Sequence, residues 1–270
     1  MSGTIFSRDA KNAIPEFETL DLGVSIISYN GSGGDVNIPA DINEETVVII
    51  GADVFSENKS ITSITIPGCV TTISERAFKN CTSLINVIIE DGLQSIGDEA
   101  FSGCKNLENV AVGIGVTKIG NSAFSSCTHL ELIELPDTVT MIGSNAFGSC
   151  KNLESITIPD TVTEIGEAAF SSCKNLESIT LGAGIAAIAP SMFSGCTNLE
   201  SINIPDSVTE IGSTAFENCK NLRHLSIPDS VTKISSDAFT GCLSIEVKYK
   251  GETIEYSHIE DLYALPEEVY

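Results

Sequence analysis

The sequence predicts a solenoid, in which short, mostly β coils with helical or 3-10 turns stack along one axis. Three observations predict it. Phenylalanine recurs every 23 residues without insertion, the residues between successive phenylalanines repeat one aliphatic pattern, and the unit is too short to bury its apolar side alone. The phenylalanines are Phe55, Phe78, Phe101, Phe124, Phe147, Phe170, Phe193, Phe216 and Phe239.

The first element of each unit is a short strand. In the unit that begins at Phe147, the aliphatic residues are Leu153, Ile156 and Ile158. The last two stand two positions apart, with one residue between them, as on one face of a strand. Leucine or isoleucine stands six residues after all nine phenylalanines. We therefore expect one strand after each phenylalanine, with its aliphatic side chains directed inward.

A turn, a second strand and a helical turn complete the unit. Pro159 and Asp160 are suited to the centre of a tight turn. Residues 162–165, Val-Thr-Glu-Ile, alternate and are rich in β-branched residues, which predicts a strand. Gly166 ends it, and we expect about one turn of helix over residues 167–170. Strands of adjacent coils would lie ~4.8 Å apart, and the constant repeat length favours a regular, curved solenoid.

Both ends of the chain depart from the repeat, and we interpret them as caps, because the open ends of a solenoid need covering. We expect an N-terminal cap over 1–44, the repeats over 45–239 and a C-terminal cap over 240–270. Residues 30–34, Asn-Gly-Ser-Gly-Gly, predict a hairpin turn, and residues 245–256 predict a hairpin around Gly251. Four tyrosines spaced by seven residues are also compatible with an amphipathic docking helix. They are Tyr249, Tyr256, Tyr263 and Tyr270.

The repeat Ala-Phe-x-x-Cys-x-x-Leu-x-x-Ile-x-Ile-Pro-x-x-Val-Thr-x-Ile-Gly resembles the BspA-like subfamily of leucine-rich repeats. Residues 146–166 match it at every defined position, and the resemblance covers residues 55 to about 245. It implies a right-handed leucine-rich-repeat solenoid, usually at a cell surface or secreted, that serves adhesion or partner binding and has no catalytic residues. The departures are small. Asn58 replaces the first cysteine, and residues 181–184, Leu-Gly-Ala-Gly, replace Ile-Pro-Asp-Thr.

The composition argues against several partner classes. The formal net charge of -23 repels nucleic acid and anionic membranes, whereas basic partners remain compatible with it. No apolar run approaches the ~20 residues of a transmembrane helix. The segment from Met1 to Lys11 lacks the apolar stretch of a signal peptide. We expect no nucleic-acid binding and no membrane insertion, and the oligomeric state stays open.

Eight of the nine cysteines occupy one repeat position, three residues after a phenylalanine. Stacked parallel side chains keep their Cβ atoms about one coil apart, whereas a disulfide needs ~3.8 Å. A straight column also gives each sulfur two neighbours in a line, not a tetrahedral set of metal ligands. We therefore predict buried structural thiols, no metal and no cofactor. Cys69 lies outside the column, after Pro67, and is also predicted to be buried.

The sequence contains no recognisable catalytic group. The three histidines, His129, His224 and His258, belong to no motif. The glycine-rich residues 30–34 are followed by neither the Lys-Ser/Thr pair nor the helix of a phosphate loop. We therefore predict a protein without enzymatic activity.

Five glutamates share the position seven residues after a phenylalanine. If they lie ~5 Å apart, each adjacent pair repels by ~0.8 kcal/mol in bulk water, and lysines three residues earlier offset part of this. Two interpretations stay open: a solvated, partly paired face, or a strip for a cationic partner or for Ca²⁺. Ca²⁺ is not favoured, because its site would need six or more oxygen ligands. The glutamates are Glu108, Glu131, Glu154, Glu177 and Glu200, and the lysines are Lys105, Lys151, Lys174 and Lys220.

The positions eight and ten residues after each phenylalanine are expected to point outward from the first strand. They are small and polar, apart from an apolar spot at Ile88, Ala111 and Leu132. They lack the Tyr, Trp and Arg of tight interfaces, so binding would be weak or multivalent. An ordinary β surface is the alternative. With the five glutamates, the candidate binding residues are Ile88, Leu132, Glu134, Ser155, Thr157, Ser178, Thr180, Ser201, Asn203 and His224.

The sequence therefore favours a non-enzymatic protein-binding or adhesion scaffold that engages host, matrix or cell-surface partners through the repeats. The alternative is a structural or assembly module that pairs with another chain through its ends or flanks.

Overall fold

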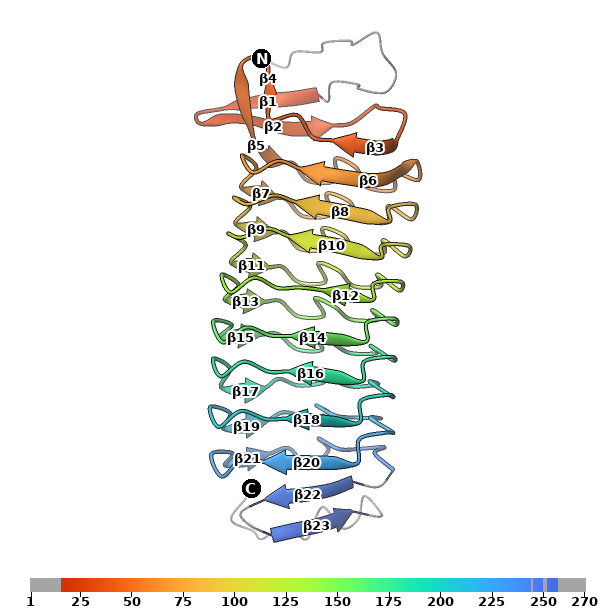
Figure 1. Cartoon of the computed structure of the whole chain (residues 1–270), viewed down its shortest axis with the longest axis vertical. Helices are drawn as coiled ribbons and strands as arrows, with labels where there is room; N and C mark the ends of the chain where they lie inside the picture. Colours follow the sequence, from red (N-terminus) through yellow and green to blue (C-terminus); the bar gives the residue numbers. More distant parts are fainter. Residues whose placement is uncertain (1–15, 244, 250–251, 257–270) are drawn as a thin grey trace.

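The predicted solenoid is confirmed by a computed structural model of the chain, in which short coils stack along one long axis (Figure 1). The structure describes residues 16–243, 245–249 and 252–256. Its 23 regular elements are all strands, and these described ranges contain no helix. Each repeat contributes one strand to a long-strand face and one to a short-strand face. The phenylalanines lie on the turn side, which joins the short-strand face to the next long strand.

The long-strand face is built from the strands that follow each phenylalanine. Their partners in adjacent coils are parallel and 23 residues apart, as in the pairs Ser155–Ser178 and Ile156–Ile179. The ladder is interrupted between β12 and β14, so this face consists of two sheets. The strands are β6 (Ile61–Ile66), β8 (Asn86–Ile89), β10 (Asn109–Val112), β12 (Leu132–Ile133), β14 (Ser155–Thr157), β16 (Ser178–Thr180), β18 (Ser201–Asn203) and β20 (His224–Ile227).

The short-strand face is also parallel, and most of its strands have two residues. Its ladder is interrupted once, between β15 and β17. The strands are β5 (Glu45–Ile50), β7 (Thr72–Ile73), β9 (Ser95–Ile96), β11 (Lys118–Ile119), β13 (Met141–Ile142), β15 (Glu164–Ile165), β17 (Ala187–Ile188), β19 (Glu210–Ile211) and β21 (Lys233–Ile234).

At the N-terminal end, β2 (Gly23–Ser28) continues the short-strand face and β3 (Gly34–Asn37) continues the long-strand face, each by parallel pairing. The predicted hairpin turn over residues 30–34 is therefore wrong, since the flanking strands belong to different sheets. β1 (Glu16–Leu20) pairs antiparallel with β2, and β4 (Asp41–Ile42) pairs antiparallel with β5. The parallel stack thus begins within the segment expected to be a cap, and the boundary at residue 44 stays a prediction.

At the C-terminal end, the hairpin predicted over residues 245–256 is confirmed. β22 (Ile245–Tyr249) pairs parallel with β20, and β23 (Glu252–Tyr256) pairs antiparallel with β22. The register slips by one residue here, because His224 pairs with Glu246 rather than with the residue after it. Tyr263 and Tyr270 lie outside the described residues. Handedness, curvature and capping stay predictions.

The core is a set of columns, and the phenylalanine column runs the length of the stack. The nine rings are stacked with centroid separations of 4.8 to 5.9 Å. The ring of Tyr29 packs on Phe55 at 4.9 Å, tilted by 44°, and extends the column by one aromatic residue. Offset aromatic pairs contribute about 0.5–1.5 kcal/mol beyond the burial of their area. The column therefore ties each coil to the next along the turn side.

The segment around each phenylalanine forms turns, and the predicted one-turn helix is wrong. The N–H groups of Ala146 and Gly148 donate to carbonyls three residues earlier. Those of Asn145, Phe147 and Ser149 donate instead to the next coil. Asn145 and Ser149 have φ of 56° and 62°, in the left-handed region that a right-handed helix excludes. The turn side is thus a third inter-coil ladder, in which every second N–H reaches the neighbouring coil.

The cysteine column lies beside the rings. Of the eight column cysteines, the first seven are buried and Cys242 is half-buried. All nine cysteines of the chain are free thiols. Each column thiol lies 3.0–3.2 Å from the carbonyl oxygen of the phenylalanine one coil earlier, a distance at which it donates a weak hydrogen bond. Cys69, expected to be buried, is half-buried, with its sulfur 3.5 Å from the Ala40 carbonyl oxygen.

One coil interface is weakened at three successive places. β15 and β17 form no ladder, the rings of Phe170 and Phe193 have the widest separation of the column at 5.9 Å, and β16 pairs with β18 at a single residue pair. These three contacts are made by successive segments of the chain. We call this region, from β15 to β16 on one side and from β17 to β18 on the other, the fault. Its sequence departs from the repeat: alanine replaces glycine at 189, proline removes an N–H at 190, and Met192 replaces a smaller alanine.

The glycine position explains part of this weakening. At Gly143 and Gly166, an added Cβ would lie 2.6 and 2.3 Å from the backbone nitrogen of the preceding coil. Ala189 carries that Cβ, so its coil must move away. Ser74 and Ser235 stand at the same repeat position and keep their inter-coil bonds. A Cβ at this position therefore does not by itself remove the inter-coil bond, and Pro190 and Met192 are further departures at the fault.

The fault predicts a local site of amide exchange. The N–H groups of Thr209 and Gly212 donate across their interface at 2.9 Å, whereas Ala186 and Ala189, at the same repeat positions, make no such bond in the described structure. We expect amides 186 and 189 to exchange at least tenfold faster than amides 209 and 212 in native-state hydrogen exchange. Equal protection of the two pairs would contradict the assignment.

The buried thiols predict a stability that falls at alkaline pH. Burial raises the pKa of Cys173 from 9.0 to about 12 and also raises the pKa of Cys150. The native state thus favours the protonated thiol, so the stabilisation is complete below the unfolded pKa and is lost as the pH rises toward the folded pKa. In urea unfolding between about pH 8 and 11, we expect Cys150→Ala/Cys173→Ala to lose less stability than the parent protein. An identical pH dependence would refute this.

Candidate functional site

The long-strand face carries the candidate binding residues, and strand alternation directs them outward. On β16 and β18 the outer residues are exposed while Ile179 and Ile202 between them are buried. The ten candidates other than the glutamate column are exposed, except Ser155, which is half-buried. Because the ladder breaks after β12, they do not form one continuous strip. Ile88, Leu132 and Glu134 belong to the first sheet and its edge, and the others belong to the second sheet.

The glutamate column lies along the start of these strands. Its members are exposed, and the backbone stacks directly: Glu154 N–H donates to the Glu131 carbonyl at 3.3 Å, and Glu177 N–H donates to the Glu154 carbonyl at 2.9 Å. The column continues into Arg223, whose backbone N–H donates to the Glu200 carbonyl at 3.1 Å. Sequence reasoning missed Arg223, although it occupies the same repeat position. Within the described residues, none of the four expected lysines forms an ion pair with these glutamates.

A shallow depression of about 350 Å³ lies on the second sheet, over β18, β20 and β22. It brings together three candidates, Ser201, Asn203 and His224, with Glu246 and Lys248. His224 Nδ1 lies 3.6 Å from Glu246 Oε2. The last two residues were missed because they lie beyond the regular repeat, although the alternation of β22 was a signal for them. Such a surface offers donors and acceptors of hydrogen bonds to a polar ligand.

The histidines and cysteines do not form catalytic pairs in the described structure. His129 is exposed, with its Nδ1 2.7 Å from the Lys105 carbonyl oxygen. The Cys127 thiol is buried against the Phe101 carbonyl, and burial raises its pKa, which disfavours the nucleophilic thiolate. His258 lies outside the described residues. Among those described, no three His, Cys, Asp or Glu side chains gather as metal ligands.

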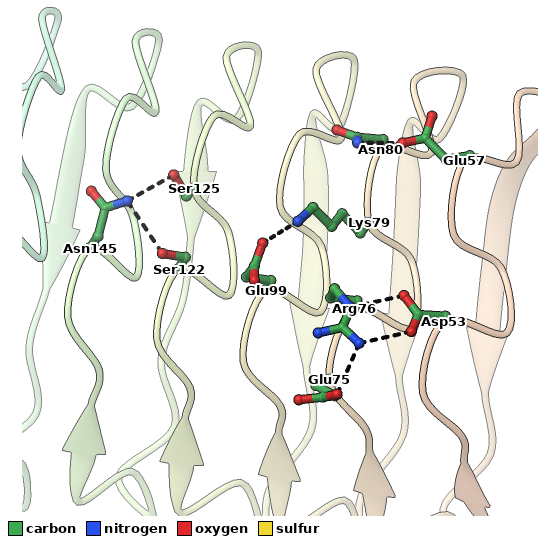
Figure 2. A network of polar contacts seen from close by, with 10 residues as sticks. All are labelled: Asp53, Glu57, Glu75, Arg76, Lys79, Asn80, Glu99, Ser122, Ser125 and Asn145. Carbon is green, nitrogen blue, oxygen red and sulfur yellow. Dashed lines mark hydrogen bonds and ion pairs between the residues drawn. The ribbon is translucent and has the colours of Figure 1, made fainter.

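A polar network on the turn side links coils near the N-terminal end (Figure 2). The Arg76 guanidinium donates to both carboxylate oxygens of Asp53, at 3.0 and 2.9 Å, and to Glu75 at 2.9 Å. The hydrogen bond from Arg76 lowers the pKa of Asp53. Lys79 pairs with Glu99 in the same region. These groups satisfy one another, so the network joins neighbouring coils rather than presenting free groups to a ligand.

Farther along the turn side, Figure 2 shows Asn145 reaching back to the preceding coil. Its Nδ2 donates to Ser122 Oγ at 3.3 Å and to Ser125 Oγ at 3.0 Å. Asn80 donates to Glu57 in the same manner, at 2.6 Å. The side-chain contacts on this side therefore follow the coil spacing, as the backbone does.

The short-strand face has a smaller depression of about 200 Å³ beside the fault. Gly120, Gly143 and Gly166 form its floor, and Lys118 and Glu164 stand at opposite sides, two coils apart. The absence of side chains at the glycines is required for close coil packing, so the hollow follows from the fold.

Within the described ranges, no helix could span a membrane.

Comparison with known proteins places this geometry in a family. The model of the BspA type leucine rich repeat region matches residues 48–147 and 117–246, with six copies. A search of the curated proteins found no match. Three similar solved structures are leucine-rich repeat proteins of bacteria.

The structure of a leucine rich repeat protein from T. pallidum is 28% identical, with a TM-score of 0.61, and the match covers 76% of this chain and 86% of that one. A leucine rich cell surface protein from Faecalibacterium prausnitzii is 26% identical, with a TM-score of 0.46, over 93% and 95% of the two chains. A leucine-rich repeat protein from Bacteroides ovatus is 24% identical, with a TM-score of 0.39, over 86% and 88%.

The glutamate column predicts a charge effect that depends on the neighbours of each glutamate. Glu154 stacks between two glutamates, whereas Glu200 stacks between Glu177 and Arg223. We expect Glu154→Gln to raise the free energy of unfolding by up to about 1.6 kcal/mol at low salt, because two repulsions of ~0.8 kcal/mol each are removed. For Glu200→Gln, the lost repulsion and the lost attraction nearly cancel. Both effects should vanish in molar salt. Equal gains for the two variants in urea unfolding would contradict the column.

Proposed function

The chain belongs to the BspA-type leucine-rich repeat family, and from this premise we propose that it is a non-enzymatic scaffold that binds other proteins through its long-strand face. The repeat family suggests a protein-interaction scaffold. We propose further that the partners are host, matrix or cell-surface proteins, so that the chain acts in adhesion.

The observation that carries the proposal is the exposed outer surface of β14, β16, β18 and β20. Parallel pairing places equivalent residues one coil apart, as in Ser155–Ser178, Thr157–Thr180 and Ser201–His224. A partner that contacts one row meets the next row ~4.8 Å farther along. Small hydroxyl and amide side chains give weak individual contacts, so affinity arises from many rows engaged together.

The state of the thiols and histidines supports a non-enzymatic role. Seven of the nine thiols are buried and hydrogen-bonded to phenylalanine carbonyls, as Cys127 is to Phe101. Two of the three histidines are exposed without a cysteine partner. The same burial is compatible with a cell-surface or secreted location, because oxidation requires an accessible thiolate.

Binding of purified protein to a panel of matrix and serum proteins, measured by surface plasmon resonance, tests the proposal. Thr157→Lys/Thr180→Lys places bulky charges on the long-strand face and should reduce binding at least tenfold. Thr163→Lys/Thr209→Lys adds the same charge on the short-strand face, where both residues are exposed, and should leave binding unchanged.

Binding of no panel member above background would refute matrix and serum proteins as partners, and equal losses in the two variants would refute binding through the long-strand face. Light scattering on the same samples tests the assembly alternative. A concentration-dependent oligomer would favour that alternative, whereas a monomer at high concentration would exclude it.

A further inference from the structure

An apolar saddle interrupts the polar outer surface of the first long-strand sheet. It consists of Ile88 on β8, Ala111 on β10 and Leu132 on β12. The side chains of Ile88 and Leu132 are 46% and 53% exposed, and Ala111 is exposed as well. Ile88 pairs directly with Ala111, and Leu132 pairs with Asn109, two residues before Ala111. The two large side chains therefore stand diagonally across Ala111, about 12 Å apart at their backbones.

The saddle is a departure from the repeat, not a product of it. At the positions of Leu132 and Ile88, β14, β16 and β18 carry serine, threonine or asparagine. The alternation of the strands leaves both aliphatic side chains outward, so neither contributes to the core. The other large exposed hydrophobic residues of the described chain lie off the outer surface of this sheet, at Leu22, Ile27, Ile114 and Leu243. Aliphatic residues thus gather outward on this sheet alone.

Acidic groups flank the saddle at β10 and β12. Glu108 precedes β10 by one residue, Glu131 precedes β12 by one residue, and Glu134 follows β12 by one residue. All three are exposed, and no ion pair neutralises them within the described structure. Their charges are close enough to attract a cation through water, within a Debye length of ~10 Å at 0.1 M salt. An apolar ligand bearing negative charge would be repelled.

We propose that the saddle binds a segment of a partner protein in which one bulky apolar side chain is flanked by lysine or arginine. The proposal rests on the function proposed above and specifies where the partner docks and what chemistry it presents. The apolar side chain sits over Ala111, where the small methyl group leaves room, and contacts Ile88 on one side and Leu132 on the other. The flanking cations lie against Glu108, Glu131 and Glu134.

The geometry favours a short extended segment. Neighbouring residues of an extended chain lie ~3.3 Å apart and point to opposite sides. A residue that lands over Ala111 thus directs its immediate neighbours away from the sheet. The residues two positions before and after it, ~6.6 Å to either side, point toward the sheet and reach the glutamates. The apolar contact supplies affinity by removing aliphatic surface from water, and the charges supply selectivity and a faster association rate.

Fluorescence anisotropy with three labelled peptides tests the pairing of apolar and basic character. The probes are Lys-Lys-Trp-Lys-Lys, the same peptide with alanine in place of tryptophan, and Glu-Glu-Trp-Glu-Glu. We expect the first to bind most tightly, the alanine peptide about tenfold more weakly, and the acidic peptide not at all. Raising the salt from 20 to 500 mM should weaken the first peptide severalfold. Equal binding of the first two peptides would show a merely electrostatic surface and overturn the proposal.

Matched variants locate the site. Leu132→Ser should reduce binding of the tryptophan peptide about tenfold, whereas Leu22→Ser, which removes an 86% exposed leucine elsewhere, should not change it. Glu108→Gln/Glu131→Gln should weaken binding more than Glu177→Gln/Glu200→Gln, although both variants remove two charges from the same column. Equal effects within either pair would exclude the saddle. Urea unfolding of each variant shows whether its fold is intact.

The two proposals fail separately. If Leu132→Ser leaves binding to the matrix and serum panel intact while Thr157→Lys/Thr180→Lys abolishes it, the scaffold function stands and the saddle is wrong. If the tryptophan peptide binds as described but no panel protein does, the saddle stands and the choice of partners is wrong.

Discussion

The inter-coil register of 23 residues is the constraint on which the rest of the structure depends. It is enforced on three sides at once, by the ladders of the long-strand and short-strand faces and by the alternating N–H bonds of the turn side. The phenylalanine rings and the cysteine thiols then repeat at the same spacing. A coil cannot shift by one residue without misplacing all of these contacts together, so core positions tolerate little variation.

The sequence predicted what periodicity controls and failed where backbone conformation or local packing decides. The spacing of Phe147 and Phe170 predicted the ring column, and alternation predicted which residues of β16 face outward. The left-handed turns at Asn145 and Ser149 were not predictable, because asparagine and serine are compatible with several conformations. The glycines at 30–34 suggested a hairpin, but the preceding and following strands pair with different sheets. For the candidate site, periodicity gave the glutamate column, whereas Glu246 and Lys248 lay beyond the register slip.

Departures from the repeat have opposite consequences inside and outside the stack. Ala189, Pro190 and Met192 lie at the contact with the neighbouring coil. That interface has no ladder on the short-strand face and keeps a single residue pair on the long-strand face. Ile88 and Leu132 point outward, and their strands both stay paired with β10, although β12 forms no ladder with β14. Outward positions can therefore vary without loss of core packing, and they are where the surface can acquire binding properties.

This freedom matters because a surface that repeats in every coil does not determine where along the stack a partner binds. A partner that binds only rows shared by every coil, such as Ser155–Ser178 or Thr157–Thr180, finds nearly equal sites each time it moves by one coil. Such contacts add affinity but fix no register. A defined complex requires residues that occur once, and the described surface offers two such regions. One is the saddle around Ala111 with its acidic rim, and the other is the depression where His224 meets Glu246 and Lys248. The regular rows between them would then strengthen a complex whose register the irregular residues determine.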